Sequence, residues 1–256
     1  MRKSPVFPLP LGEGWGEGGL RAKYQPTTTR RPILSDPQHV ETVRAGADAI
    51  ARWRAGNPDG EFDLRGADLR GVNLSNADLT GAAMSRASLS DADLSHANLE
   101  KSDLGRAALS GANLVAANLT NVNLFWADLK GANLEDAVVR HCRMNRVNLI
   151  GAHLHRTDFS RSNMIEADLR NADLTDALFV STNMNGADLS RCSMKGADFT
   201  RAMIRDSMWI AANMTGANFD QASLHRSDFT LAKWDHTTTF PKGFDPEDIE
   251  FLDVGV

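Results

Sequence analysis

Residues 66–84 read GADLRGVNLSNADLTGAAM, and in this stretch every fifth residue is large and apolar. The same spacing begins at Leu64 and ends at Trp234, with thirty-five such residues and no insertion or deletion. An α-helix repeats about every 3.6 residues and a strand about every two, so neither keeps a five-residue stripe on one face. The chain must therefore turn a corner once in each repeat.

The columns beside this stripe separate an inside from an outside. The residue two places before each stripe residue is small, usually alanine, along almost the whole stretch. The residue directly before the stripe is Asp or Asn in twenty-three of the thirty-five repeats, which predicts hydrogen bonds to local backbone at the corners. The two residues after the stripe vary freely. This pattern predicts a narrow solenoid with a filled core and a polar surface.

A second period of twenty residues indicates how many corners close one coil. Two sets of identical stripe residues have this spacing: Phe159, Phe179, Phe199 and Phe219, and Met144, Met164 and Met184. If four repeats make one turn, each set forms a ladder on one wall, which keeps stacked coils in register. The sequence therefore predicts a four-sided coil with about twenty residues per turn.

The repeats resemble those of the pentapeptide-repeat protein family, whose consensus A(D/N)LXX matches Ala67-Asp68-Leu69 and dozens of later triplets. This resemblance implies an all-β fold, a right-handed quadrilateral β-helix. With strands spaced by about 4.8 Å, the repeats would form about eight to nine coils over roughly 40 Å.

The remaining sequence is expected to cover the two ends of this solenoid. We predict four segments: a Pro/Gly-rich tail without ordered structure at 1–34, a capping helix and lead-in at 35–61, the β-helix at 62–235 and a C-terminal cap at 236–256. Residues 36–55 read as one helix, with Asp36 as its N-cap, Pro37 in its first turn and Gly56 after its end.

Apolar side chains in both end segments are expected to seal the open coils. The predicted helix carries an apolar stripe of Val40, Val43, Ala47, Ile50 and Trp53. The C-terminal segment concentrates Trp234, Phe240, Phe244 and Phe251. These rings would cover the last coil, which otherwise presents an unpaired edge.

No constellation of catalytic or cofactor-binding residues is recognisable, and the unbroken frame leaves no inserted loops to build a pocket. His153 and His155 make a poor zinc site because two further ligands are missing. The chain is therefore expected to be non-catalytic, without metal or cofactor. Cys142 and Cys192 fall in the small inward column on opposite walls, where they cannot form a disulfide. Buried thiols favour a cytoplasmic location.

Charge and hydropathy restrict the partners. The apolar residues never run together as in a transmembrane segment, so no membrane partner is expected. The net charge of −5 is too small to indicate direct binding of nucleic acid. The expected partner is another protein.

One candidate interaction surface consists of outward residues where the repeats depart most from the consensus: Arg86, Arg106, Phe125, Trp126, Arg140, His141, Arg143 and Arg146. Residues twenty apart stack, which places Arg86, Arg106, Trp126 and Arg146 in one column, with Phe125 beside it. The divergent repeats at 137–149 are expected to place Arg140, His141 and Arg143 at one corner. Stacked cations repel without an anion or partner, and aromatic residues among arginines are typical of interaction hot spots. The alternative is that outward positions tolerate any side chain.

Two functions remain open. The first is a protein-binding or scaffold module of a bacterial type, a β-helical rod that docks an acidic partner through its outer faces. The second follows from resemblance to the quinolone-resistance branch of the family, which implies a DNA-mimicking modulator of DNA gyrase. Members of that branch are typically more acidic, dimerise through a C-terminal helix, and several carry loops between coils. A homodimer through residues 240–252 is also left open.

Overall fold

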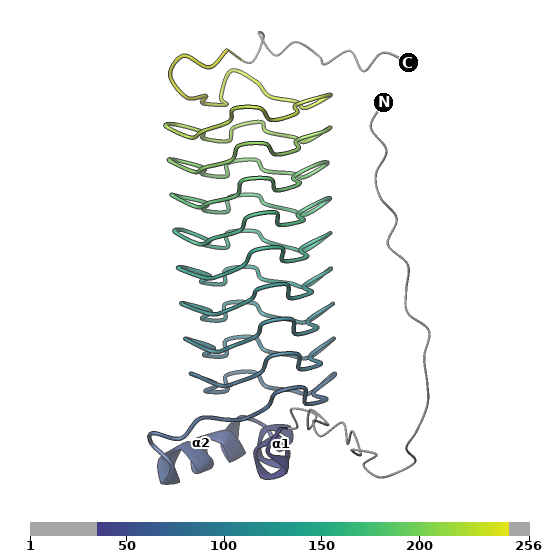
Figure 1. Cartoon of the computed structure of the whole chain (residues 1–256), viewed down its shortest axis with the longest axis vertical. Coiled ribbons are helices and arrows are strands. Elements are labelled where there is room, and N and C mark those ends of the chain that lie inside the picture. Colours follow the sequence, from purple (N-terminus) through teal and green to yellow (C-terminus); the bar gives the residue numbers. More distant parts are fainter. Residues whose placement is uncertain (1–34, 246–256) are drawn as a thin grey trace, which may run out of the picture. The chain divides into compact units, whose positions relative to one another are not determined.

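The computed structural model describes residues 35–245, and the predicted tail at 1–34 and Phe251 lie outside this part. Its backbone winds into coils with four sides, stacked one over another (Figure 1). Parallel bridges join residues twenty positions apart, from Asp63 with Ala83 to Asn213 with Lys233. The right-handed quadrilateral β-helix expected from the repeats is confirmed.

Each wall of a coil contributes a single bridging residue, and no longer strand is present within residues 35–245. The bridging residue directly precedes the stripe residue. Ala83, for example, donates its N–H to the Phe62 carbonyl at 2.8 Å, and its own carbonyl accepts from the Leu64 N–H at 2.7 Å. The β-structure is therefore a set of one-residue ladders that run along the stack.

The interior is filled by the stripe and by the small column before it. Leu114 and Ala112, one from each column, are both fully buried. The predicted phenylalanine ladder is confirmed, since Phe159 and Phe179 stack with ring centroids 5.0 Å apart and planes 9° apart. The methionines Met144, Met164 and Met184 are buried on an adjoining wall. We call this the methionine wall, defined by its stripe residues at intervals of twenty from Leu64 to Leu224.

The corners impose a backbone requirement that the sequence pattern did not reveal. The second residue after each stripe residue has a left-handed φ at every corner from Gly66 (φ 68°) to Leu231 (φ 60°). This region is sterically unfavourable for side chains that carry a Cβ, and most unfavourable for bulky ones. The position tolerates many residue types, as expected, but at a conformational cost.

The Asp and Asn side chains of the bridging column bond to the backbone as predicted. The Oδ1 of Asp78 accepts from the Thr80 N–H at 3.1 Å, and Asn73 accepts from Ser75 in the same way at 3.0 Å. Some of these side chains also link coils, since the Asn113 amide donates to Asp93 Oδ1 at 2.9 Å. The column thus stabilises both the corner and the stack.

The N-terminal cap consists of two helices, α1 (Pro37–Arg44) and α2 (Ala47–Gly56), so the single helix predicted over 36–55 is wrong. The break falls at Gly46, whose φ of 88° is outside the helical region and favours glycine. Gly56 is the last residue of α2, and Asn57 takes the C-cap position. Asp36 caps α1 as expected, since it accepts from the Gln38 N–H at 2.9 Å.

Both helices pack against the first coils. Val43 and Ile50 are fully buried, while Val40, Ala47 and Trp53 are partly buried against the core, so the apolar stripe has the predicted role. Neither helix is long and apolar enough to span a bilayer, and the same holds for the rest of the described chain.

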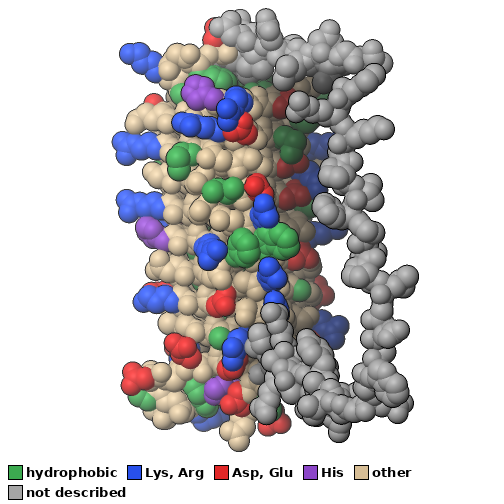
Figure 2. Space-filling view, viewed as in Figure 1, with side chains coloured by type: hydrophobic (Ala, Val, Ile, Leu, Met, Phe, Trp, Pro, Cys, Tyr) green, Lys and Arg blue, Asp and Glu red, His purple; other side chains and the backbone are tan. Residues whose placement is uncertain are grey.

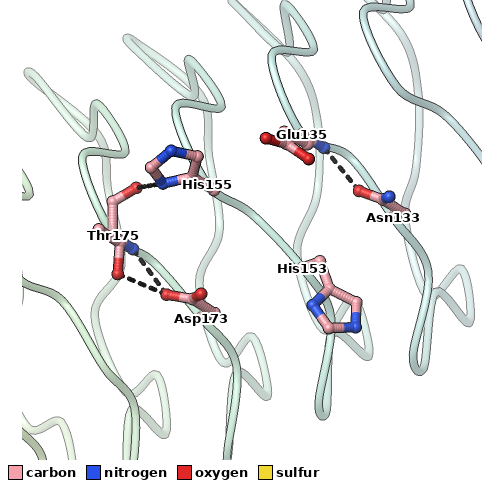
Figure 3. A pocket seen from close by; sticks show the side chains of 6 residues that line it. All are labelled: Asn133, Glu135, His153, His155, Asp173 and Thr175. Carbon is pink, nitrogen blue, oxygen red and sulfur yellow. Dashed lines mark hydrogen bonds between the residues drawn. The ribbon is translucent and has the colours of Figure 1, made fainter.

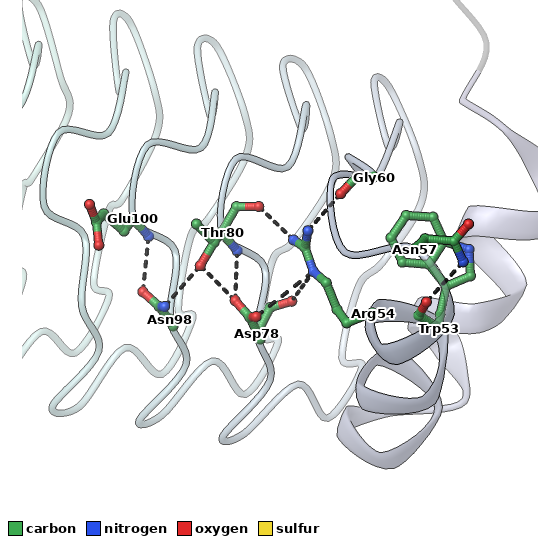
Figure 4. A network of polar contacts seen from close by, with 8 residues as sticks. All are labelled: Trp53, Arg54, Asn57, Gly60, Asp78, Thr80, Asn98 and Glu100. Atoms are coloured by element: carbon green, nitrogen blue, oxygen red, sulfur yellow. Dashed lines mark hydrogen bonds and ion pairs between the residues drawn. The ribbon is translucent and has the colours of Figure 1, made fainter.

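Arg54 ties α2 to the coils (Figure 4). Its guanidinium donates to the carbonyls of Gly60 at 2.7 Å and Thr80 at 2.5 Å, and lies 3.8 Å from the Asp78 carboxylate. The same group lies 5.2 Å from the centroid of the Phe62 ring. Helix and coil are therefore joined by both polar and aromatic contacts.

The last coil differs from the others by one residue. Asn218 pairs with Thr239, one position beyond the usual spacing of twenty. As a result Phe240 continues the ladder, with its ring 5.9 Å from that of Phe219 and the planes 10° apart. Trp234 and Phe244 pack on Phe240, at 6.0 and 5.4 Å between centroids. These three aromatic residues cover the last coil as predicted.

Candidate interaction surface

One corner of the coils holds a tryptophan between two arginines. Arg106, Trp126 and Arg146 occupy the same corner position in three successive coils. The guanidinium carbon of Arg106 lies 5.4 Å from the centroid of the Trp126 ring, and that of Arg146 lies 5.7 Å from it. Both distances are in the range of a cation–π contact. One arginine comes from the coil before Trp126 and the other from the coil after it, so the indole contacts a guanidinium group from each neighbouring coil.

A second pair lies beside this stack. The Phe125 ring stacks on Trp126 with centroids 6.1 Å apart, and the Arg143 guanidinium lies 5.1 Å from the Phe125 centroid. Trp126 remains 49% exposed. We call these five residues the aromatic–arginine cluster: Arg106, Phe125, Trp126, Arg143 and Arg146. Figure 2 shows hydrophobic side chains next to Lys and Arg side chains on the visible face of the coils.

The charges of the cluster are only partly compensated. Arg146 pairs with Glu166 at 2.6 Å, and both side chains are about half exposed, so this surface ion pair contributes little stability. Within residues 35–245, the side chains of Arg86, Arg106 and Arg143 form no hydrogen bond or ion pair. The edges of these guanidinium groups are therefore available to carboxylate or phosphate oxygens.

The predicted common corner of Arg140, His141 and Arg143 is wrong for Arg143. Arg140 and His141 are turn residues that lead into the methionine wall, whereas Arg143 is the bridging residue of that wall, paired with Asn123. The bridging residue comes two positions after each turn. Arg143 therefore lies on the wall and not at the corner, and its side chain contacts Phe125.

Arg140 has a structural role in this arrangement. Its Nε donates to the Asp158 carboxylate at 2.6 Å, and the Asp158 side chain is only 9% exposed. Burial acts to raise the pKa of Asp158, but hydrogen bonds from Arg140 and Ser160 outweigh it and lower the pKa below its usual value. The charge of Arg140 is thus compensated and does not add to the cluster.

The wall carries further cations that the sequence analysis did not single out. Lys101 and Arg161 lie in the same corner column as His141, before the methionine wall, so the spacing of twenty would have found them. We define the basic wall as the outward residues of the methionine wall and its two corners between positions 80 and 166. It carries seven cations and three carboxylates: Arg86, Lys101, Arg106, Arg140, Arg143, Arg146 and Arg161, with Glu100, Asp103 and Glu166. Because Asp158 on the neighbouring wall compensates Arg140, six cations stand against these three carboxylates.

Trp126 occupies a backbone position that disfavours it. Its φ is 58°, in the left-handed region where a bulky side chain is uncommon. Backbone strain of this kind persists where the surroundings or a function require the residue. The strain at Trp126 coincides with its exposed ring and the arginines around it.

His153 and His155 lie on a different wall, around a shallow depression (Figure 3). The lining residues are Asn133, Glu135, His153, His155, Asp173 and Thr175. His155 Nδ1 lies 3.0 Å from the Thr175 carbonyl oxygen, and Asp173 accepts from the N–H and hydroxyl of Thr175. The part of the chain that the structure describes contains no group of three or more side chains able to hold a metal ion.

The two cysteines are buried and unpaired with each other. Burial raises the pKa of both Cys142 and Cys192 to about 12. Their thiols each lie 2.9 Å from a backbone carbonyl, of Leu119 and Leu169 respectively. A protonated buried thiol is a poor nucleophile.

Comparison with known proteins identifies the repeats. A family model described as a pentapeptide repeat region matches residues 152–229, and a model of eight pentapeptide repeats matches residues 63–95, 87–124 and 127–164. No curated protein matches the chain.

Several solved structures are similar. One is HetL, a pentapeptide repeat protein involved in heterocyst differentiation regulation in the cyanobacterium Nostoc sp. strain PCC 7120. It is 26% identical, with 78% of this chain and 98% of HetL covered and a TM-score of 0.44. Another is full-length QnrB1, a plasmid-mediated fluoroquinolone resistance protein. It is 14% identical, with 66% of this chain and 92% of QnrB1 covered and a TM-score of 0.45.

Proposed function

Because the chain belongs to the pentapeptide-repeat family, we propose that it is a non-catalytic module whose basic wall docks an acidic segment of another protein. The observation that supports this most directly is the aromatic–arginine cluster, in which Trp126 lies between Arg106 and Arg146. The buried free thiols support our placing this function in the cytoplasm.

The cluster has the chemistry of a binding hot spot. Trp and Arg dominate the energetics of many protein interfaces, where they lie at the centre of the contact. Stacking on the aromatic rings holds the guanidinium planes of Arg106 and Arg143 in place before a ligand arrives. Preorganised side chains lose less conformational entropy on binding, which favours affinity. Their unpaired edges match the geometry of carboxylates.

An acidic protein segment fits the cluster better than a nucleic acid does. Proteins that bind single strands stack bases on the open faces of aromatic side chains. The Trp126 ring already contacts two guanidinium groups and the Phe125 ring, and Phe125 also contacts the Arg143 guanidinium. The exposed edge of the indole can still contact an apolar side chain. The proposed partner therefore presents carboxylates next to an apolar residue.

The gyrase alternative gains no support from this wall. A mimic of DNA needs a surface dense in negative charge, and the basic wall has the opposite character. A gyrase supercoiling assay with and without the protein would distinguish the two functions.

The test compares proteins that co-purify with the wild type and with two variants. In the first, Trp126→Gly is combined with Arg106→Glu, which removes the ring and reverses one charge while glycine accepts the left-handed corner. The second, Arg191→Glu, reverses the charge of an exposed arginine at the same repeat position (φ 60°) on a different corner.

We expect an acidic protein that binds the wild type and Arg191→Glu but loses at least tenfold in affinity for the double variant. Equal recovery with all three proteins would contradict the proposal. Circular dichroism should show that all three keep the same fold.

A further inference from the structure

We propose that the basic wall also binds an acidic segment of this same chain, residues 247–253, which then competes with the partner. The inference rests on the proposed function for its choice of wall, and it assigns a regulator to that wall.

The segment has the composition that the cluster favours. Residues 247–253 read EDIEFLD, so four carboxylates alternate with three large apolar side chains. Carboxylates can pair with the free edges of Arg106 and Arg143, which form no ion pair within residues 35–245. An apolar side chain such as Leu252, seven residue steps or roughly 23–25 Å from Asp245, can lie against the exposed indole edge.

The described part of the chain ends beside the methionine wall of the solenoid. Residues 241–245 line one hollow at the last coil together with Ala222, Leu224 and His225. Leu224 is a stripe residue of the methionine wall, and Ala222 is the small residue before it. The chain therefore leaves the last coil beside the wall that carries the cluster.

The segment is long enough to reach the cluster. Five coils separate Leu224 from Leu124, the stripe residue before Phe125, which corresponds to about 24 Å at about 4.8 Å per coil. An extended chain covers about 3.3–3.6 Å per residue, so the eight residue steps from Asp245 to Asp253 span roughly 26–29 Å. No rearrangement of the coils is required.

The path along the wall offers both charges and apolar contacts. Met203 is the bridging residue three coils after Arg143 in the same column, and its side chain is 45% exposed. Arg201 and Arg205 lie on either side of it in the sequence and are both exposed. The neighbouring carboxylate of Asp206 is already paired with Arg226 at 2.6 Å. An acidic, partly apolar segment therefore meets complementary side chains before it reaches the cluster.

The opposite wall is a poorer site. Five carboxylates lie on it and its following corner between positions 93 and 176: Asp93, Glu135, Asp136, Asp173 and Asp176. They face a single arginine, Arg156, which is already paired with Glu135 and Asp136. Like charges disfavour an acidic segment there, so charge selects between the two walls.

The first experiment maps the segment directly in the full chain. The photoreactive residue p-benzoylphenylalanine replaces Phe251, and peptides crosslinked within one chain are identified by mass spectrometry after irradiation. We expect crosslinks to residues 123–146. Combining Arg143→Glu with Arg146→Glu should reduce them at least fivefold, whereas the matched corner variant Arg191→Glu should leave them unchanged.

Crosslinks to other walls, or only between two copies of the chain, would overturn the inference. Thermal melting of each variant separates a loss of docking from a loss of fold.

The second experiment separates this inference from the proposed function. A fluorescein-labelled peptide that copies residues 247–253 is titrated with the wild type and with a full chain whose segment is neutralised: Glu247→Gln, Asp248→Asn, Glu250→Gln and Asp253→Asn. If the segment occupies the wall, the neutralised chain should bind the peptide at least tenfold more tightly.

The two proposals fail in different ways. Equal peptide binding by both chains, with no crosslinks to residues 123–146, overturns the inference and leaves the proposed function standing. No peptide binding by either chain overturns the proposed binding of acidic segments, while the crosslinks then decide the inference independently.

Discussion

Phe179 and Phe199 stack with ring centroids 4.8 Å apart and planes 3° apart, although twenty residues separate them in the sequence. The distance equals the spacing between neighbouring strands of about 4.8 Å, so each ring fills the level of one coil. The pair therefore contributes to the core and also fixes the register of two coils.

Replacing a ring of this ladder by alanine should destabilise the protein more than replacing it by leucine. Phe179→Ala leaves a cavity in a fully buried column, and we expect a loss of about 3–5 kcal/mol in the free energy of unfolding, measured in urea. Phe179→Leu is the matched control, because Leu99 and Leu119 occupy the same column at other levels. A loss below about 1 kcal/mol for the alanine variant would argue against a register role for the ladder.

The corner conformation predicts an unusual order of stability at Trp126. Its φ of 58° strains any residue with a Cβ, so Trp126→Gly should be more stable than Trp126→Ala by about 1–2 kcal/mol. Urea unfolding of the two variants measures the difference. At Val115, a half-buried turn residue that directly precedes the left-handed position of its corner, the order should be reversed or absent. If Trp126→Ala is more stable than Trp126→Gly, the prediction is wrong, and the backbone at this corner leaves the left-handed region once the indole is removed.

The thiols should resist alkylation in the folded protein. Burial raises the pKa of Cys142 and Cys192 to about 12, so both remain protonated at the pH of about 8–9 where an ordinary thiol begins to ionise. We expect iodoacetamide to modify neither in buffer and both in urea, as measured by intact mass. Stability from these protonated thiols is present below the unfolded pKa and decreases as the pH rises toward 12. Rapid labelling of the native state would contradict their burial.

The Arg140–Asp158 pair should make the free energy of unfolding depend on pH in the acidic range. The folded pKa of Asp158 is lowered, so its contribution is present above the unfolded pKa of about 4 and is lost as the pH falls toward the folded value. Asp158→Asn should therefore reduce the difference in unfolding free energy between neutral pH and a pH of about 3. Asp91→Asn, at an exposed corner, is the control and should keep the wild-type difference. The same pH dependence in both variants would show that the pair is not its source.

The sequence predicts the repeating part of this structure well because one short pattern recurs in every coil. The spacing of Phe159 and Phe179 alone indicates which residues stack, and the Asp and Asn column indicates the corner bonds. Departures from the period are harder to predict. Nothing in the apolar pattern of residues 36–55 marks the break at Gly46, because glycine also occurs within helices.

The candidate surface was predicted in part. The column of Arg106, Trp126 and Arg146 follows from the period of twenty. The contact of Arg143 with Phe125 and the pairing of Arg140 with Asp158 do not, since both are diagonal and join residues eighteen positions apart. Such contacts depend on the direction of long side chains, which a column-by-column reading does not contain.

The extra residue in the last coil limits how far this architecture can grow. Identical coils with a constant period could in principle add to one another end to end and form filaments, as unpaired strand edges do in aggregates. Pairing of Asn218 with Thr239 shifts the ladder by one position, and the ring of Phe240 then covers the shifted coil. At the other end α1 and α2 cover the first coil. The single insertion and the Phe240 ring are therefore expected to oppose end-to-end assembly of these coils.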